Sequence, residues 1–209
     1  MSFEVDVSKR LGDRQLQRRF STGGGLTVLF GPSGSGKSSI LNMVSGLLRP
    51  DWGSIRANSA VLFDSAAGID LPPEKRGIGY VFQDARLFPH RRVRANLLYG
   101  HRLAPEQRRW MSLEEAVDFL GIGHLLERWP RSLSGGEAQR VAIGRALLAG
   151  AQALLMDEPL ASVDQARREE ILRVIERIRD ELKVPILYVT HDRAEAERLA
   201  SEMVVLEPL

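Results

Sequence analysis

The chain has 209 residues, 44% hydrophobic and 27% charged, which is ordinary for one globular domain that buries a core. The formal net charge is only +2, so charge gives no argument for nucleic acid as a partner. The sequence contains no cysteine, which excludes a disulfide framework, a cysteine-ligated zinc and a thiol nucleophile.

The N-terminal part of the chain alternates apolar and polar residues. The alternation predicts a half-buried edge strand over 3–7 and a returning strand over 16–20, joined by a turn at Gly12 and Asp13. The run 26–30 is apolar and rich in β-branched residues, which predicts a buried strand. Up to residue 83 the pattern then predicts a helix ending near 48, two short strands within 54–63, a loop at 72–76 and a strand over 77–82.

A glycine-rich loop directly follows the predicted strand 26–30. It matches the P-loop pattern G-x-x-x-x-G-K-[ST], and its residues are Gly31, Pro32, Ser33, Gly34, Ser35, Gly36, Lys37, Ser38 and Ser39. The glycines let successive N–H groups turn toward an anion, and the following helix adds its dipole. We expect Lys37 to reach the β- and γ-phosphates, Ser38 to ligate Mg²⁺ and Ser39 to add a phosphate contact. The loop stands between a predicted strand and a predicted helix, as in a P-loop, which favours a nucleotide site over a plain glycine turn.

The second half of the chain first becomes helical and then alternates again. Apolar residues at helical spacing occupy 93–126, and Ser134 stands before a helix over about 136–148. The remaining predicted elements are a strand over 153–156, a long helix with Ile171, Ile175, Ile178 and Leu182 on one stripe, a strand over 186–190, a helix over 193–200 and a strand over 203–206. This alternation predicts an α/β fold with a mainly parallel sheet, and the helical stretch between Gln83 and Asp157 predicts a subdomain.

Two acidic residues, Asp157 and Glu158, follow the predicted strand 153–156. Their carboxylates therefore emerge at the strand ends, where parallel sheets bind ligands. Asp157 resembles a Walker-B aspartate, which holds Mg²⁺ directly or through water. Glu158 is placed to polarise the attacking water as general base. Beside a P-loop, the pair favours this chemistry over a solvated strand end.

A second glycine turn, formed by Ser134, Gly135 and Gly136, also stands at a helix start. A hydroxyl, two glycine N–H groups and a helix N-terminus make another anion site, besides capping the helix. One nucleotide's terminal phosphate is not easily enclosed by both glycine loops within one small domain.

The order of the motifs resembles that of ABC-type ATPases. In chain order they are the P-loop, Gln83, Leu-Ser-Gly-Gly-Glu at 133–137, Leu-Leu-Met-Asp-Glu at 154–158, Ala-Ser-Val-Asp at 161–164, and His191. The resemblance covers nearly the whole chain and implies an α/β P-loop NTPase fold with an N-terminal antiparallel β subdomain. It implies one ABC ATPase domain over 1–209, with a RecA-like core at about 1–83 and 150–209 and a helical subdomain at about 84–149.

The resemblance also implies roles for the motif residues, with ATP and Mg²⁺ as cofactors. Two domains would form a homodimer head to tail, so that the 134–136 turn of one closes on the nucleotide held by the other. Gln83 would reach Mg²⁺ or the attacking water, and His191 would act as the switch histidine on the γ-phosphate. Asp164 would belong to the loop that crosses the dimer interface. A nucleotide-sensing module without turnover is disfavoured, because Glu158 and His191 are both present.

One position departs from the family pattern. Family members often stack adenine on an aromatic residue in the early strand–turn region, where this chain has Leu11. Base binding would then rest on apolar contact or on a planar guanidinium such as that of Arg10. We expect phosphate contacts to supply most of the affinity and ATP and GTP to bind comparably.

Within the family, residues 79–90 resemble importer ATPases, and residues 71–76, 84–90, 93–100 and 142–148 most resemble the ATPase subunits of molybdate importers. The resemblance implies two membrane-spanning permease subunits and, indirectly, a periplasmic or extracellular substrate-binding protein as partners, and no nucleic acid. The segment after Gln83 and the helical subdomain would form the groove for a permease helix. Sulfate, iron or polyamine import stay open as alternatives, and a non-transport ABC ATPase acting on nucleic acid or ribosomes is the main rival.

The chain carries no apolar run near the roughly 20 residues of a membrane span, and residues 1–6 alternate unlike a signal peptide. We expect a protein that is soluble when isolated and peripheral at the cytoplasmic face of the inner membrane. Molybdate-importer ATPases usually continue into a small oxyanion-binding β domain. Because this sequence ends at Leu209, we expect either a shortened chain or a member without that domain.

Overall fold

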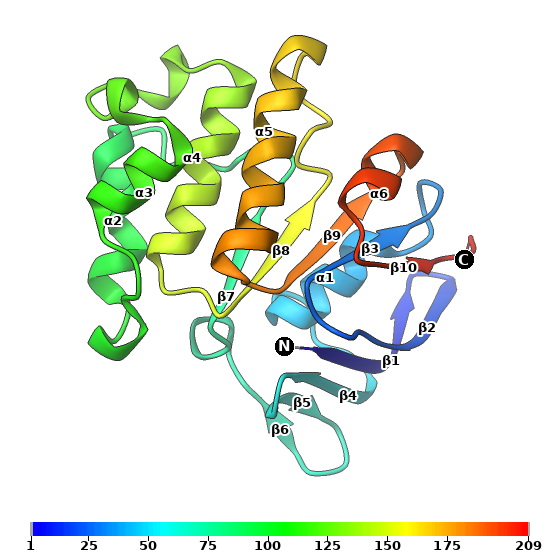
Figure 1. Cartoon of the computed structure of the whole chain (residues 1–209). Coiled ribbons are helices and arrows are strands. Elements are labelled where there is room, and N and C mark those ends of the chain that lie inside the picture. The colour runs from blue at the N-terminus through cyan, green and yellow to red at the C-terminus, as the bar shows by residue number, and fades with distance from the viewer. Residues whose placement is uncertain (1, 209) are drawn as a thin grey trace.

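The computed structural model describes residues 2–208 and contains two five-stranded sheets (Figure 1). The antiparallel sheet has the order β2-β1-β4-β5-β6, and the parallel sheet has the order β10-β3-β9-β8-β7. The strands are β1 (Phe3–Leu11), β2 (Arg14–Ser21), β3 (Leu26–Phe30), β4 (Trp52–Ala57), β5 (Ala60–Asp64), β6 (Ile69–Asp70), β7 (Ile78–Val81), β8 (Ala153–Asp157), β9 (Ile186–Thr190) and β10 (Glu202–Val205). The predicted parallel sheet and N-terminal antiparallel unit are confirmed.

The helices surround the parallel sheet. They are α1 (Lys37–Ser45), α2 (Val93–Leu103), α3 (Leu113–Leu120), α4 (Gly135–Leu148), α5 (Gln165–Arg177) and α6 (Arg193–Leu199). Single 3-10 turns occupy η1 (Pro73–Lys75), η2 (Glu106–Arg108), η3 (Gly123–Leu125) and η4 (Pro130–Ser132), and α5 continues into a π-helical turn, η5 (Ile178–Leu182). Within the described residues, no helix is both long enough and apolar enough to cross a membrane.

Each face of the parallel sheet buries its own core, because side chains of a strand alternate between faces. On β8, Leu154 packs with the apolar residues of helices α2 to α6, whereas Leu155 packs on the opposite side. That second core joins α1 to the antiparallel sheet, with Ile40 and Val5 among its fully buried members. The parallel sheet is therefore the middle layer, and α1 lies between it and the antiparallel sheet (Figure 1).

The predicted helical stretch 93–126 is broken into separate elements. Helix α2 ends at Leu103 ahead of Pro105, which cannot donate a helical N–H. Helix α3 starts afresh at Ser112, whose hydroxyl accepts from the N–H of Glu115 in a capping box. The helix after the P-loop also begins earlier than its apolar pattern showed, at Lys37 rather than near Ile40.

Strand order decides which loops meet. Strands β3, β9 and β8 are consecutive neighbours in the parallel sheet, and their registers pair Phe30 with Thr190 and Asp157 with Val189. Parallel strands end at the same edge, so the loops that follow them lie together. The P-loop follows β3, the turn with His191 follows β9, and Glu158 directly follows β8.

Candidate functional site

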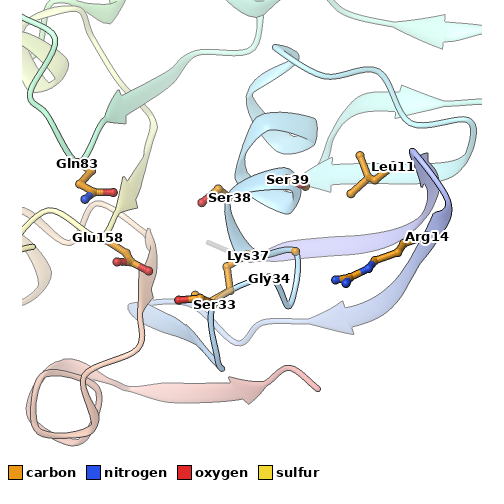
Figure 2. A pocket seen from close by; sticks show the side chains of 10 residues that line it. Leu11, Arg14, Ser33, Gly34, Lys37, Ser38, Ser39, Gln83 and Glu158 are labelled. Atoms are coloured by element: carbon orange, nitrogen blue, oxygen red, sulfur yellow. The ribbon is translucent and has the colours of Figure 1, made fainter. Parts of the chain in front are cut away.

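A cavity of about 500 Å³ opens at this edge of the sheet (Figure 2). It is lined by Leu11, Arg14, Ser33, Gly34, Gly36, Lys37, Ser38, Ser39, Gln83 and Glu158. Figure 2 shows Gln83 and Glu158 on one side of the P-loop and Leu11 and Arg14 on the other. The cavity therefore has an acidic and amide end, a phosphate-sized loop in the middle, and an aliphatic and cationic end.

The backbone of the loop is arranged for an anion. Gly34 and Gly36 have φ of 82° and 89°, a region that other residues rarely adopt. Helix α1 has no side-chain cap on its first N–H groups and no acidic residue in its first turn. Uncapped N–H groups and the helix dipole make this terminus a phosphate site. The Ser35 hydroxyl is fully buried and has no hydrogen-bond partner among the described residues.

Lys37 lies folded across its own loop. Its Nζ donates to the carbonyl oxygens of Gly31 and Pro32, at 2.7 and 2.9 Å, and the residue is buried. Burial lowers the pKa of the ammonium, although the nearby carboxylates of Glu158 and Asp157 oppose the shift. An incoming phosphate would replace loop carbonyls as the acceptor, a charge-assisted and therefore stronger partner.

Ser38 and Asp157 meet across 119 residues of sequence. The Ser38 hydroxyl donates to Asp157 Oδ1 at 2.9 Å, and the Tyr80 hydroxyl is 3.2 Å from Oδ2. Burial raises the pKa of Asp157, partly offset by these hydrogen bonds. A serine hydroxyl, a carboxylate and the Gln83 amide are the hard oxygen donors that suit Mg²⁺ alongside phosphate. The residues present therefore fit this cation.

Glu158 and His191 form a contact that joins two strand ends. His191 Nδ1 lies 3.0 Å from Glu158 Oε2. Glu158 has a left-handed φ of 43°, uncommon for a residue with a side chain, and its N–H is held by the carbonyl of Val189 at 3.0 Å. Strain of this kind persists where the surrounding structure fixes it and often marks functional sites. The structure thus brings the predicted base and the predicted switch histidine together.

Gln83 reaches the cavity on a segment that helix α4 holds in place. Gln139 donates to the Phe82 carbonyl at 3.0 Å, and the Arg145 guanidinium donates to the Ala85 and Arg86 carbonyls at 3.0 and 2.8 Å. Ala85 and Arg86 both have positive φ, so these hydrogen bonds hold a strained turn.

The second glycine turn is not part of this cavity. None of Ser134, Gly135 and Gly136 lines it. Ser134 accepts from the N–H of Glu137, and the Glu137 carboxylate accepts from the N–H of Ser134 in return, which forms a capping box. Asp164 caps the next helix, α5, through the N–H of Arg167. Both predicted interface motifs serve here as helix caps in a single chain.

The aliphatic end of the cavity is formed by Leu11 with Arg14, whereas Arg10 does not line it. Leu11 and Arg14 are directly paired across the β1–β2 hairpin and so share one face, while Arg10 lies on the next position along β1. The Arg10 guanidinium instead donates to the Gly12 carbonyl. Of the two expectations for the base, apolar contact at Leu11 fits the cavity, and the hairpin register indicates Arg14 rather than Arg10 as the cation beside it.

Comparison with known proteins agrees with this geometry. The family model described as ABC transporter matches residues 20–161. This chain belongs to the ABC transporter family. Among solved structures, a dimeric ATP-binding cassette in a post-hydrolysis state, bound to ADP and Pi, is 26% identical. The structural alignment covers 99% of this chain and 94% of that cassette, with a TM-score of 0.79. A dimeric bacterial ABC transporter cassette matches at 27% identity and a TM-score of 0.77.

Among curated ABC relatives, the molybdenum import ATP-binding protein ModC of Mesorhizobium japonicum is 57% identical over 99% of this chain and 56% of its own length. The protein of the same name from Paramagnetospirillum magneticum is 54% identical over 98% of this chain and 56% of its own length. The chain thus spans about half the length of the curated relatives it matches.

Sequence reasoning missed two further contacts of this ABC site. Tyr80 bridges Asp157 and Asn42, at 3.2 and 3.1 Å, and its burial beside that carboxylate raises the pKa of its hydroxyl. Gln139 was absent from the predicted set although it fixes the carbonyl before Gln83. A tyrosine in a strand and a glutamine in a helix are more often plain packing residues, so no local pattern identifies either.

Proposed function

We propose that the chain is the ATP-binding and ATP-hydrolysing part of an importer for molybdate. The cavity supports this proposal by combining an uncapped P-loop helix, the Ser38–Asp157 pair and the Glu158–His191 contact at one edge of the sheet. The name of the curated relatives, molybdenum import ATP-binding protein, supplies the cargo. The division into a core of about 1–83 and 150–209 and a helical subdomain of about 84–149 forms part of the same proposal.

Each polar group has a role that follows from its position. The loop N–H groups and Lys37 would bind the phosphates, and Ser38 with Asp157 and Gln83 would hold Mg²⁺. When bound, this cation neutralises phosphate charge. Glu158 would accept the proton of the attacking water, and His191 would donate a hydrogen bond to the γ-phosphate. Leu11 and Arg14, at the opposite end of the cavity, would face the base and ribose.

A second copy of the chain would complete the site. The turn at 134–136 lies outside the cavity of its own chain, and the N–H groups of Gly135 and Gly136 stand in the first turn of α4, where a helix offers them no internal acceptor. Two copies paired head to tail would bring the turn of one onto the nucleotide of the other. Two solved cassettes that this chain resembles are described as dimers, which is consistent with this pairing.

The importer would add two membrane-spanning permease subunits and an external substrate-binding protein. The chain would then sit at the cytoplasmic face of the inner membrane, attached through its partners. The residues of the cavity are assigned to the nucleotide and Mg²⁺ and none to the cargo. The cargo must therefore be identified by measuring uptake. In cells that lack their own molybdate ATPase, expression of this chain with its permease should restore molybdate uptake. Restoration of sulfate, iron or polyamine uptake instead would replace the cargo assignment.

The hydrolysis proposal is tested by Glu158→Gln. Removing the base while keeping a neutral isostere should leave ATP binding intact, abolish turnover and accumulate a dimer with ATP and Mg²⁺ in sedimentation experiments. The wild-type chain should hydrolyse ATP and return to monomers. A variant that stays monomeric under saturating ATP and Mg²⁺ would contradict the proposal, and ATPase activity stimulated by DNA would favour the non-transport rival.

A further inference from the structure

His191 is poorly held by its own packing. Its side chain is 57% exposed, and among the described residues its only polar side-chain contact is with Glu158. It is also the single residue between the end of β9 at Thr190 and Asp192, the N-cap of α6. The direction of the imidazole therefore depends on how firmly these two neighbours are fixed.

Both neighbours are tied to one buried carboxylate. The Thr190 hydroxyl donates to Glu195 Oε2 at 2.9 Å and accepts from the backbone N–H of Asp192 at 3.0 Å. Asp192 in turn caps α6 by accepting from the N–H of Ala194 at 2.8 Å. Thr190 and Glu195 are 2% and 9% exposed, so water competes little for these hydrogen bonds.

An arginine connects this turn to the segment after β8. Arg168 donates from Nε to the Val163 carbonyl at 3.2 Å. Its Nη1 lies 3.7 Å from Asp192 Oδ2 and 3.9 Å from Glu195 Oε1. A small cavity of about 120 Å³ adjoins the Glu158–His191 contact, and its lining residues are Glu158, Ala161, Arg168, Thr190, His191, Asp192 and Glu195.

We propose that Thr190, through Glu195, is a positioning residue that aims His191 at the terminal phosphate. The Thr190 hydroxyl, on the residue before His191, closes the turn by accepting from the N–H of Asp192, the residue after it, and Glu195 anchors that hydroxyl to α6. Arg168 fixes the position of Glu195 relative to the segment that follows β8 and contains Glu158. The inference rests on the proposed ATPase function, because it assigns a task to groups around its catalytic pair.

The chain contains a matched control for a role in folding alone. The Tyr188 hydroxyl donates to the same Glu195 Oε2, also at 2.9 Å, from two residues earlier on β9. Tyr188 is fully buried, and among the described residues its hydroxyl makes no hydrogen bond to residues 190–192, the turn that contains His191. Tyr188→Phe and Thr190→Val each remove one hydroxyl from Glu195, but only the second releases the Asp192 N–H.

The experiment compares the two variants in the full chain with ATP and Mg²⁺. Thr190→Val should lower kcat by about tenfold or more, because misplacing a reacting group by about 1 Å can cost on the order of 100-fold. Its affinity for ATP should stay within about twofold, since P-loop contacts are unchanged. Tyr188→Phe should keep kcat within about twofold of the wild-type value. Its loss of thermal stability should be similar to that of Thr190→Val, because each variant removes one hydroxyl from Glu195.

The conservative variant Thr190→Ser, which keeps the hydroxyl, should restore most of the kcat lost in Thr190→Val. Equal kcat values for Thr190→Val and Tyr188→Phe would overturn the positioning role, as would a failure of the serine variant to rescue. A wild-type chain without ATPase activity would instead contradict the proposed function, so the two failures are distinguishable.

Discussion

Two helix N-termini of this chain are rich in glycine, yet they are built differently. Helix α1 begins after Gly36 with no side-chain cap, and its first N–H groups open into the cavity. Helix α4 begins after Ser134, whose hydroxyl satisfies the N–H of Glu137, and it carries an acidic residue in its first turn. The first terminus is open to an anion from its own chain, whereas the second is already stabilised without one.

In the proposed head-to-tail dimer, this difference would let the two turns bind phosphate without competing for it. An uncapped terminus gains from a phosphate both hydrogen bonds and dipole energy. A terminus with a capping box already has part of that energy, and Glu137 repels an anion. The P-loop should therefore bind nucleotide in a single chain, while the 134–136 turn should contribute only when a second chain brings a phosphate to it.

The largest effect should follow from Lys37→Ala. Loss of a charged donor to phosphate costs about 1.5–3 kcal/mol, which corresponds to an affinity for ATP lower by roughly 10- to 150-fold. Isothermal titration calorimetry on the full chain would measure the loss. Lys75→Ala, at an exposed lysine on η1, is the control and should bind as wild type. If Lys37→Ala bound ATP with unchanged affinity, the N-terminus of α1 would not be the phosphate site that this comparison assumes.

Ser134→Ala should show that the two helix termini act in different steps, the α1 terminus in ATP binding and the α4 terminus in hydrolysis. Removing this cap should destabilise the chain by about 1 kcal/mol, leave ATP affinity of the single chain unchanged, and lower hydrolysis. Ser112→Ala is the matched control, because Ser112 makes the same capping box with Glu115 on α3. It should cost similar stability and leave hydrolysis intact. Weaker ATP binding by monomeric Ser134→Ala would contradict the separation.

Asp157→Asn should make the chain without nucleotide more stable at neutral pH. Burial raises the pKa of Asp157, so the folded state binds a proton more tightly than the unfolded state, and stability is lost as pH rises through that folded-state pKa. Removing the charge should raise Tm by about 2–4 °C, as expected for about 1 kcal/mol in a chain of this size.

This gain should disappear below about pH 3, where the carboxyl is protonated in both the folded and the unfolded state. Asp180→Asn is the control for the sign, because a hydrogen bond from Arg179 lowers the pKa of Asp180 and its removal should give no gain. Thermal unfolding followed by circular dichroism at several pH values would test both variants. A lower Tm for Asp157→Asn at neutral pH would contradict the burial argument.

The smallest effect concerns the far end of the cavity. Arg14→Ala should weaken binding of ATP and GTP by a similar few-fold, because a partly solvated guanidinium contributes about 0.5–1 kcal/mol. Arg10→Ala should bind as wild type, since Arg10 does not line the cavity. Competition between the two nucleotides for a fluorescent analogue would measure both variants. A strong preference for ATP in the wild-type chain would contradict the expected lack of base discrimination.

The sequence by itself determined the features that depend on local spacing. The order of glycines, lysine and serine at 31–39, the acidic pair after an apolar strand, and the alternation of strands and helices each leave a pattern within about twenty residues. From these the α/β class, the parallel sheet and the phosphate loop could be predicted. The breaks in the 93–126 stretch were not, because caps and a proline there override the helical spacing.

Only the tertiary structure decided which distant groups touch. Strand order placed His191 against Glu158, and hairpin register chose Arg14 over Arg10. The link from Thr190 to Glu195 depends on the packing of α6 against β9. Local periodicity fixes the face on which a side chain lies but carries no information about its partner across the core, because that contact follows from how whole elements pack together.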